Sequence, residues 1–160
     1  MRTRLGLPLI AKDTLKETLG EPLGVTARAA SQRLGTAVFE LLAVIVRELL
    51  EHDVSLIVEG NFTTRTRLFA SLPPCRVAQI HVSASSATLR ARLLERAGDR
   101  HPVHYDHEAA NEIAARATAG EWDPLPLAGI LLRIDTTNGF SSDVPALLTE
   151  ALAGASVRLF

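Results

Sequence analysis

The chain has 160 residues, 47% of them hydrophobic, which suits one globular domain and argues against intrinsic disorder. A formal net charge of −1 gives no general attraction to nucleic acid or to an anionic membrane, so we expect neither partner. The single Cys75 excludes an internal disulfide framework and fits a cytoplasmic location. No apolar run reaches about 18 residues and the N-terminus has no signal-peptide pattern, so we expect no membrane segment.

Short apolar runs alternate with segments of helical periodicity along the whole chain. The runs are too short for helices and read as buried strands. The longest helical segment repeats its apolar residues at i, i+3, i+4 and i+7, with Gly35 as a candidate interruption. In chain order we expect a strand over 7–11, a helix over 13–20 with Asp13 as candidate N-cap, a helix over 26–52, a strand over 54–59, a short helix over 63–72, a strand over 77–82, helices over 85–97 and 106–120, a strand over 130–134 and a helix over 143–153.

This alternation predicts an α/β fold, with a parallel sheet covered by helices on both faces. Ligands bind such sheets at the carboxyl ends of the strands. The polar residues just past each strand are therefore the candidate functional residues, although Asp, Asn and Ser at these places can equally be helix caps. They are Lys12, Asp13, Glu59, Asn61, Ser83, Asp135 and Thr136.

Four segments, in order, resemble one family: LGLPLIAKDTLKE (5–17), SLIVEGNF (55–62), LRARLLERAGDRHPVH (89–104) and LRIDTT (132–137). Together they resemble the AAA-type P-loop kinases, the group near the chloramphenicol phosphotransferases, gluconate kinases and zeta toxins. The resemblance implies a single P-loop NTPase domain over 1–160, with a lid over about 96–107. It further implies an ATP- and Mg²⁺-dependent phosphotransferase whose acceptor is a small-molecule hydroxyl.

The resemblance assigns catalytic roles to one carboxylate and two arginines. Asp13 matches the family's acid after the second strand, which contacts the acceptor hydroxyl and can serve as general base. Arg96 and Arg100 match lid arginines that close over the transferring phosphate, a role that suits the planar guanidinium. Arg92, Arg96 and Arg100 recur every four residues and share one face if the helix continues. The alternative for this set is a solvated basic face paired with Glu95 and Asp99.

The remaining candidate residues follow from the same resemblance. Glu59 ends a strand that resembles a Walker B element, so we expect it to bind Mg²⁺ directly or through water. Lys12, Asn61 and Arg65 are candidates for binding the substrate; a solvated side chain is the alternative for Lys12 and Arg65. The candidates for binding the nucleotide are Arg92, Asp135 and Thr136.

Three histidines, His101, His104 and His107, have a spacing that could suggest a metal site. Pro102 breaks a regular helix there and no cysteine is nearby in the sequence, so we do not expect zinc.

The Walker A pattern, G-x-x-x-x-G-K-[ST], occurs nowhere in the 160 residues. In the family, the strand that precedes this loop lies between those resembling 55–59 and 77–82. We therefore expect the first strand and the P-loop to be absent, and phosphate transfer by this chain to be impaired. The explanations are a coding start placed too late, a strand supplied by a second copy or a strand-complementing partner, or a non-catalytic remnant that binds a nucleotide or a partner.

Overall fold

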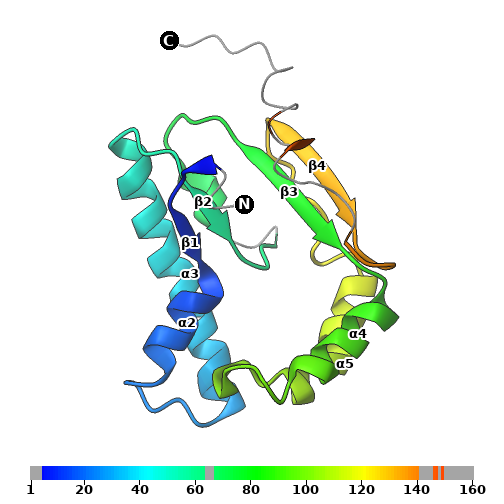
Figure 1. Cartoon of the computed structure of the whole chain (residues 1–160). Coiled ribbons are helices and arrows are strands. Elements are labelled where there is room, and N and C mark those ends of the chain that lie inside the picture. Colours follow the sequence, from blue (N-terminus) through cyan, green and yellow to red (C-terminus); the bar gives the residue numbers. More distant parts are fainter. Residues whose placement is uncertain (1–4, 64–66, 141–145, 148, 150–160) are drawn as a thin grey trace.

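The computed structural model describes residues 5–63, 67–140, 146–147 and 149. Helices and strands alternate along the chain, as the apolar pattern predicts (Figure 1). The elements are β1 (Leu9–Ala11), α2 (Lys12–Gly20), α3 (Arg28–Glu51), β2 (Ile57–Glu59), the 3₁₀ helix η1 (Arg67–Ser71), β3 (Ala78–Ser83), α4 (Ser86–Arg96), the 3₁₀ helix η2 (Pro102–His104), α5 (Asp106–Thr118) and β4 (Ile130–Asp135).

The strands form two separate parallel pairs. β1 pairs with β2 so that Ala11 lies opposite Glu59, and β3 pairs with β4 so that Ser83 lies opposite Asp135. Within the described residues β2 and β3 do not pair, so each has an edge without a neighbouring strand. The expected parallel direction is confirmed, but the expected single sheet is corrected to two pairs, which Figure 1 shows apart.

The long helix α3 provides much of the core because its inward residues recur at helical spacing. Leu34 and Val38 pack with Val103 of η2, whereas Leu42 and Val46 pack with Leu68 of η1. α3 therefore holds α2, the β1/β2 pair and η2 in one unit. Gly35 does not interrupt this helix, which is continuous from Arg28 to Glu51.

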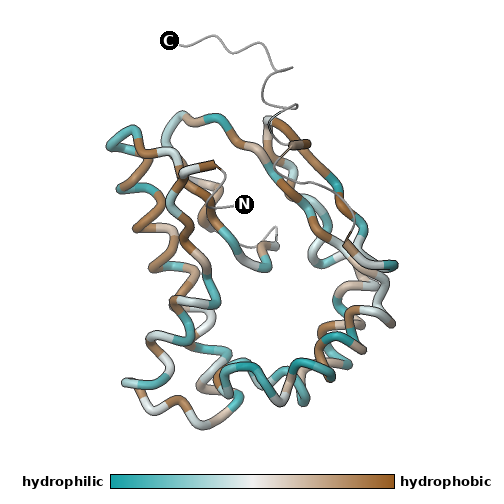
Figure 2. Tube along the Cα trace, viewed as in Figure 1, coloured by the Kyte–Doolittle hydropathy of each residue, from teal (hydrophilic) through white to brown (hydrophobic). Residues whose placement is uncertain are grey.

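The helices α4 and α5 pack on each other and are joined by a largely hydrophilic segment that returns toward α2 and α3 (Figures 1 and 2). Ser85 caps α4, accepting a hydrogen bond from the Thr88 N–H. Tyr105 precedes α5 with a left-handed backbone (φ 53°), which makes a sharp turn between η2 and α5. This turn places Asp106 in the first turn of α5, facing the interior.

Two sequence expectations need correction here. Asp13 is not the N-cap of α2: Ala11 holds that position, and Asp13 lies in the first turn. The helix expected over 63–72 is a 3₁₀ helix over Arg67–Ser71. The helix expected over 143–153 lies largely outside the described residues. No helix in the described part of the chain is long and apolar enough to cross a membrane.

Candidate active site

The carboxyl ends of β1 and β2 bring the first candidate residues together. Lys12 and Asp13 follow directly on β1, and the β1/β2 register puts Glu59 beside that end. The approach is close at Gly60, where an added Cβ would stand 3.2 Å from the Cβ of Lys12. Electrostatic coupling between Asp13 and Glu59 is consistent with this neighbourhood.

Asp13 has cationic partners on both sides. Lys12 Nζ donates to Asp13 Oδ1 at 2.9 Å, and Arg100 Nη2 donates to Asp13 Oδ2. Partial burial tends to raise the pKa of Asp13, but the charge and hydrogen bond of Lys12 and the charges of Arg100 and His104 outweigh it. The net effect lowers the pKa of Asp13, which is therefore ionised at neutral pH.

Arg100 reaches Asp13 because a buried carboxylate fixes the other side of its guanidinium. Asp106 is 6% exposed and accepts hydrogen bonds from Arg100 Nη1 at 2.8 and 3.1 Å and from Arg96 Nε at 2.9 Å. Arg96 and Arg100, the two arginines expected in the lid, thus share the carboxylate of Asp106. The alternative interpretation had paired the arginines with Glu95 and Asp99. This role of Asp106 could not be predicted from the sequence, because it depends on the left-handed turn that precedes α5.

The arginine spacing does not produce one helical face. α4 ends at Arg96, so Arg100 lies beyond the helix and reaches Asp106 from the connecting segment. Arg92 turns to a different partner, donating from Nη1 to Thr136 Oγ1 at 2.9 Å and from Nη2 to the Thr136 carbonyl at 2.6 Å. The single arginine face was expected only if the helix continued past Arg96, and the end of α4 at Arg96 means that this condition is not met.

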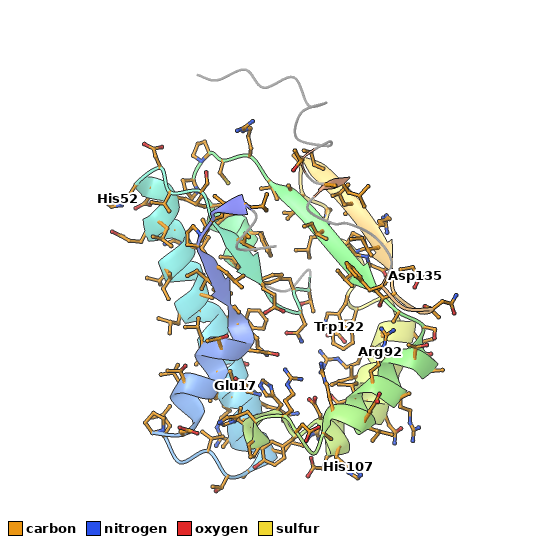
Figure 3. The ribbon with its side chains drawn as sticks, viewed as in Figure 1. Glu17, His52, Arg92, His107, Trp122 and Asp135 are labelled. Carbon is orange, nitrogen blue, oxygen red and sulfur yellow. The ribbon has the colours of Figure 1, made fainter. Side chains whose placement is uncertain are left out.

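Arg92 and Thr136 belong to a second polar group, at the carboxyl ends of β3 and β4. Figure 3 labels Arg92 and Asp135 in this region. Thr136 is buried and donates from Oγ1 to the Ser83 carbonyl at 2.9 Å, while Asp135 accepts hydrogen bonds from Thr137. These bonds lower the pKa of Asp135. The three residues expected to bind nucleotide are thus adjacent, and within the described residues no hydrogen bond joins them to Asp13.

The remaining residues expected in the site are Glu59, Asn61 and Arg65. Glu59 is exposed as a residue, yet partial desolvation of its carboxyl, with the negative charge of Asp13, raises its pKa. Asn61 is exposed. Arg65 lies outside the described residues. None of these observations tests the roles expected for them.

Two further side chains, Lys16 and His104, also lie in this region, although the sequence did not predict them there. Lys16 is 7% exposed on the inner side of α2. His104, considered only as a metal ligand, lies 2.7 Å through Nε2 from Glu17 Oε1. Burial lowers the pKa of His104 despite that carboxylate. His101 pairs instead with Glu21, at 3.4 Å, and the described residues contain no cluster of three or more metal-ligating side chains.

A half-open cavity of about 300 Å³ adjoins this group on the segment that joins α4 to α5. Arg100, His104 and Asp106 line part of it, so the ion-paired arginine borders solvent-accessible space. The site thus combines an ionised carboxylate at the end of a strand with a guanidinium that a small ligand can approach.

No family model matches the chain, and no curated protein matches it. Among solved structures it is similar to the 1.70 Å crystal structure of a protein from Chloroflexus aurantiacus J-10-fl described as a "putative kinase". The two share 33% sequence identity with a TM-score of 0.79, over 95% of this chain and 86% of the other. The chain has a kinase-like fold and belongs to the same family as that protein.

Proposed function

We propose that this chain carries the acceptor site and the lid of an ATP-dependent phosphotransferase that acts on a small-molecule hydroxyl. The observation that carries the proposal is the contact between Asp13, at the end of β1, and Arg100, from the α4–α5 connection. Phosphoryl transfer requires positioning and charge stabilisation, and these two side chains supply a base and a phosphate-binding cation. The kinase-like relative supports the same class of reaction.

Asp13 would accept a hydrogen bond from the acceptor hydroxyl and take its proton as the oxygen attacks. Its ion pair with Arg100 must then open, which frees the guanidinium for phosphate oxygens. Arg96 already shares Asp106 with Arg100 and can move with it. Lys12 and Asn61 would orient the acceptor, together with Arg65. Arg92, Asp135 and Thr136 would contact the nucleotide at the neighbouring strand ends.

The residues around Glu59 suit a Mg²⁺ ion. Mg²⁺ usually keeps several waters and takes one or two carboxylates plus substrate phosphates, so a large cluster of protein ligands is not required. Desolvation first, and then the charge of Asp13, raises the pKa of Glu59, and a bound divalent cation would relieve the repulsion between the two carboxylates. When bound, the ion would neutralise charge on the ATP phosphates.

In the described part of the chain β2 and β3 each have an edge without a neighbouring strand, which favours a further strand between them that would join the two parallel pairs into one sheet. We propose that this strand brings the phosphate-binding loop, which the 160 residues do not contain. Its source is an extended form of the chain or a strand-complementing partner. The 160 residues alone would then transfer phosphate weakly.

Amide hydrogen exchange tests the proposed strand. The amides on the edge of β2 that faces away from β1, and on the edge of β3 that faces away from β4, should exchange quickly in the 160-residue chain. These free-edge amides should become protected in a version extended upstream in the same reading frame. Amides shared by β3 and β4 provide the internal control. Equal protection of the free-edge amides in both versions would refute the added strand.

Transfer of radiolabelled phosphate from ATP to a panel of small alcohols, sugars and sugar acids tests the function. The extended version should be active, and Asp13→Asn should lower kcat about 10²–10⁴-fold. Thr14→Ala, at the exposed neighbouring position, is the matched control and should stay near wild type. A folded extended version that neither binds nor hydrolyses ATP would overturn the proposal. That result would favour the second candidate, a non-catalytic remnant, which the lack of a Walker A pattern motivates.

A further inference from the structure

The inward side of α2 is unusual because lysines occupy it. The buried residues of this helix are Lys12, Lys16 and Gly20, spaced by four and therefore aligned along one stripe. Leu15 and Leu19 pack beside the stripe against the core and anchor the helix. A helix held by leucines thus presents two cations to the interior of the molecule.

The two lysines differ in their partners. Lys12 bonds to Asp13, and its ammonium lies 5.7 Å from the centre of the Phe39 ring. Lys16 is 7% exposed and has no hydrogen bond or ion pair within the described part of the chain. The ammonium nitrogen of Lys16 is not fully enclosed and keeps contact with solvent. A mostly buried cation without a partner is costly, and a bound anion would offset that cost.

The surroundings of Lys16 restrict where such an anion can lie. On α2 itself Lys12 and Asp13 are its charged neighbours. Arg100 and His104 face it from the α4–α5 connection, and Asp106 faces it from the first turn of α5. On α3 the facing residue is Gly35, where an added Cβ would stand 3.9 Å from Lys16 Cε. Burial first, and then the charge of Lys12, lowers the pKa of Lys16 to about 8, so most of it is charged at neutral pH.

We propose that Lys16 binds an anionic group of the acceptor. The molecule that offers its hydroxyl to Asp13 is then a compact hydroxy acid, or a compact alcohol that carries a phosphate group in place of the carboxylate. This inference rests on the proposed function of Asp13. Residues three apart on a helix have Cβ atoms about 5–6 Å apart, which matches a hydroxyl and an anionic group separated by a few bonds. Asp13 and Lys16 have that spacing.

A binding experiment can test this without phosphoryl transfer. Lys12 and Lys16 are the two lysines of the chain, so lysine labelled with ¹³C at Cε gives two assignable NMR signals. The probes are glycerate, glycerol 3-phosphate, inorganic phosphate and glycerol. We expect the anions to shift the Lys16 signal and raise its pKa, and glycerol to do neither. Glycerate and glycerol 3-phosphate distinguish a carboxylate from a phosphate as the bound group.

Two variants complete the test. Lys16→Met should weaken binding of the effective anion about tenfold or more, the loss expected for a charge-assisted bond. Lys16→Arg should retain most of the binding, and circular dichroism checks that both variants fold. The proposal is wrong if none of the anions moves the Lys16 signal, if glycerol moves it as much, or if Lys16→Met binds the anions as wild type does. Each of these results leaves the proposed role of Asp13 to be judged by the transfer assay.

Discussion

One guanidinium, that of Arg100, joins Asp13 on α2 to Asp106 on α5. Arg100 donates from Nη2 to Asp13 and from Nη1 to both carboxylate oxygens of Asp106. Asp13 and Arg100 are 87 residues apart in sequence, so the contact ties the end of β1 to the α4–α5 connection. Asp13 is thus already ion-paired. Under the proposed function, a substrate hydroxyl would have to compete with Arg100 for this carboxylate.

Removing Arg100 should raise the pKa of Asp13. Burial of the Asp13 carboxyl opposes ionisation, and the lowered pKa depends on Lys12, Arg100 and His104. Arg100→Met removes one of these positive charges, so the balance moves toward the protonated acid. NMR titration of ¹³C-labelled aspartate measures the shift. Arg90→Met is the matched control, because Arg90 on α4 bonds to Asn111 instead of an acid.

The same variant has a consequence for acid stability. The folded-state pKa of Asp13 is below the ordinary value of 3.8, so its contribution to stability is present above that value and is lost as pH falls through the folded pKa. Arg100→Met should make this loss smaller in the acid range. An Asp13 pKa and an acid unfolding curve identical to wild type would show that the ion pair is not formed in solution.

The buried carboxylate of Asp106 should matter for stability as well. Asp106→Ala leaves Arg100 and Arg96 without their shared acceptor, and we expect a loss of about 1–3 kcal/mol in the free energy of unfolding. Urea denaturation measures it. Asp99→Ala is the control, since Asp99 is exposed on the same connection. Equal stability of the two variants would contradict the structural role of Asp106.

The sequence predicted the elements well where apolar periodicity was strong. The strands at β1, β2, β3 and β4 and the long α3 lie close to their expected bounds, because these segments bury apolar side chains at a regular spacing. Residues at strand ends were predicted for a related reason, since a parallel pair aligns the carboxyl ends of its strands. Lys12, Asp13 and Glu59 gather there as expected.

The contacts that depend on tertiary turns could not be predicted. The periodic spacing of Arg92, Arg96 and Arg100 indicated one helical face, but α4 ends at Arg96. The partner of Arg100 depends on the left-handed turn at Tyr105, a conformation that local propensity disfavours. Lys16 escaped notice because a lysine on an amphipathic helix usually faces solvent.

Two glycines give a matched test of how α2 and α3 pack. At Gly20 an added Cβ would stand 2.8 Å from Val103 Cγ2, so Gly20→Ala should push on η2 and cost about 1–3 kcal/mol. At Gly35, inside α3, the nearest neighbouring atom is 3.9 Å away, so Gly35→Ala should add about 0.5–1 kcal/mol of stability. Thermal unfolding of both variants checks the opposite signs. Loss of stability at Gly35 would mean that α3 is not a continuous helix there.

Lys16 should make the protein more stable as pH rises past neutrality. Its folded-state pKa of about 8 is below the ordinary lysine value of 10.5, so between these values the unfolded chain keeps a proton that the folded protein has released. Unfolding then takes up a proton, and stability increases with pH in that range. Replacing Lys16 by Met removes both the desolvated charge and this pH dependence, so the variant should be at least as stable as wild type at neutral pH.

Urea denaturation at several pH values from about 7 to about 9.5 measures both effects. Arg33→Met, at an exposed position of α3, is the control and should keep the wild-type slope. A Lys16→Met variant that is more stable yet binds anions poorly would show a stability cost retained for binding, as expected of a functional residue. A variant that is less stable, with a wild-type protein whose stability does not rise with pH, would mean that Lys16 has a partner in solution and is structural.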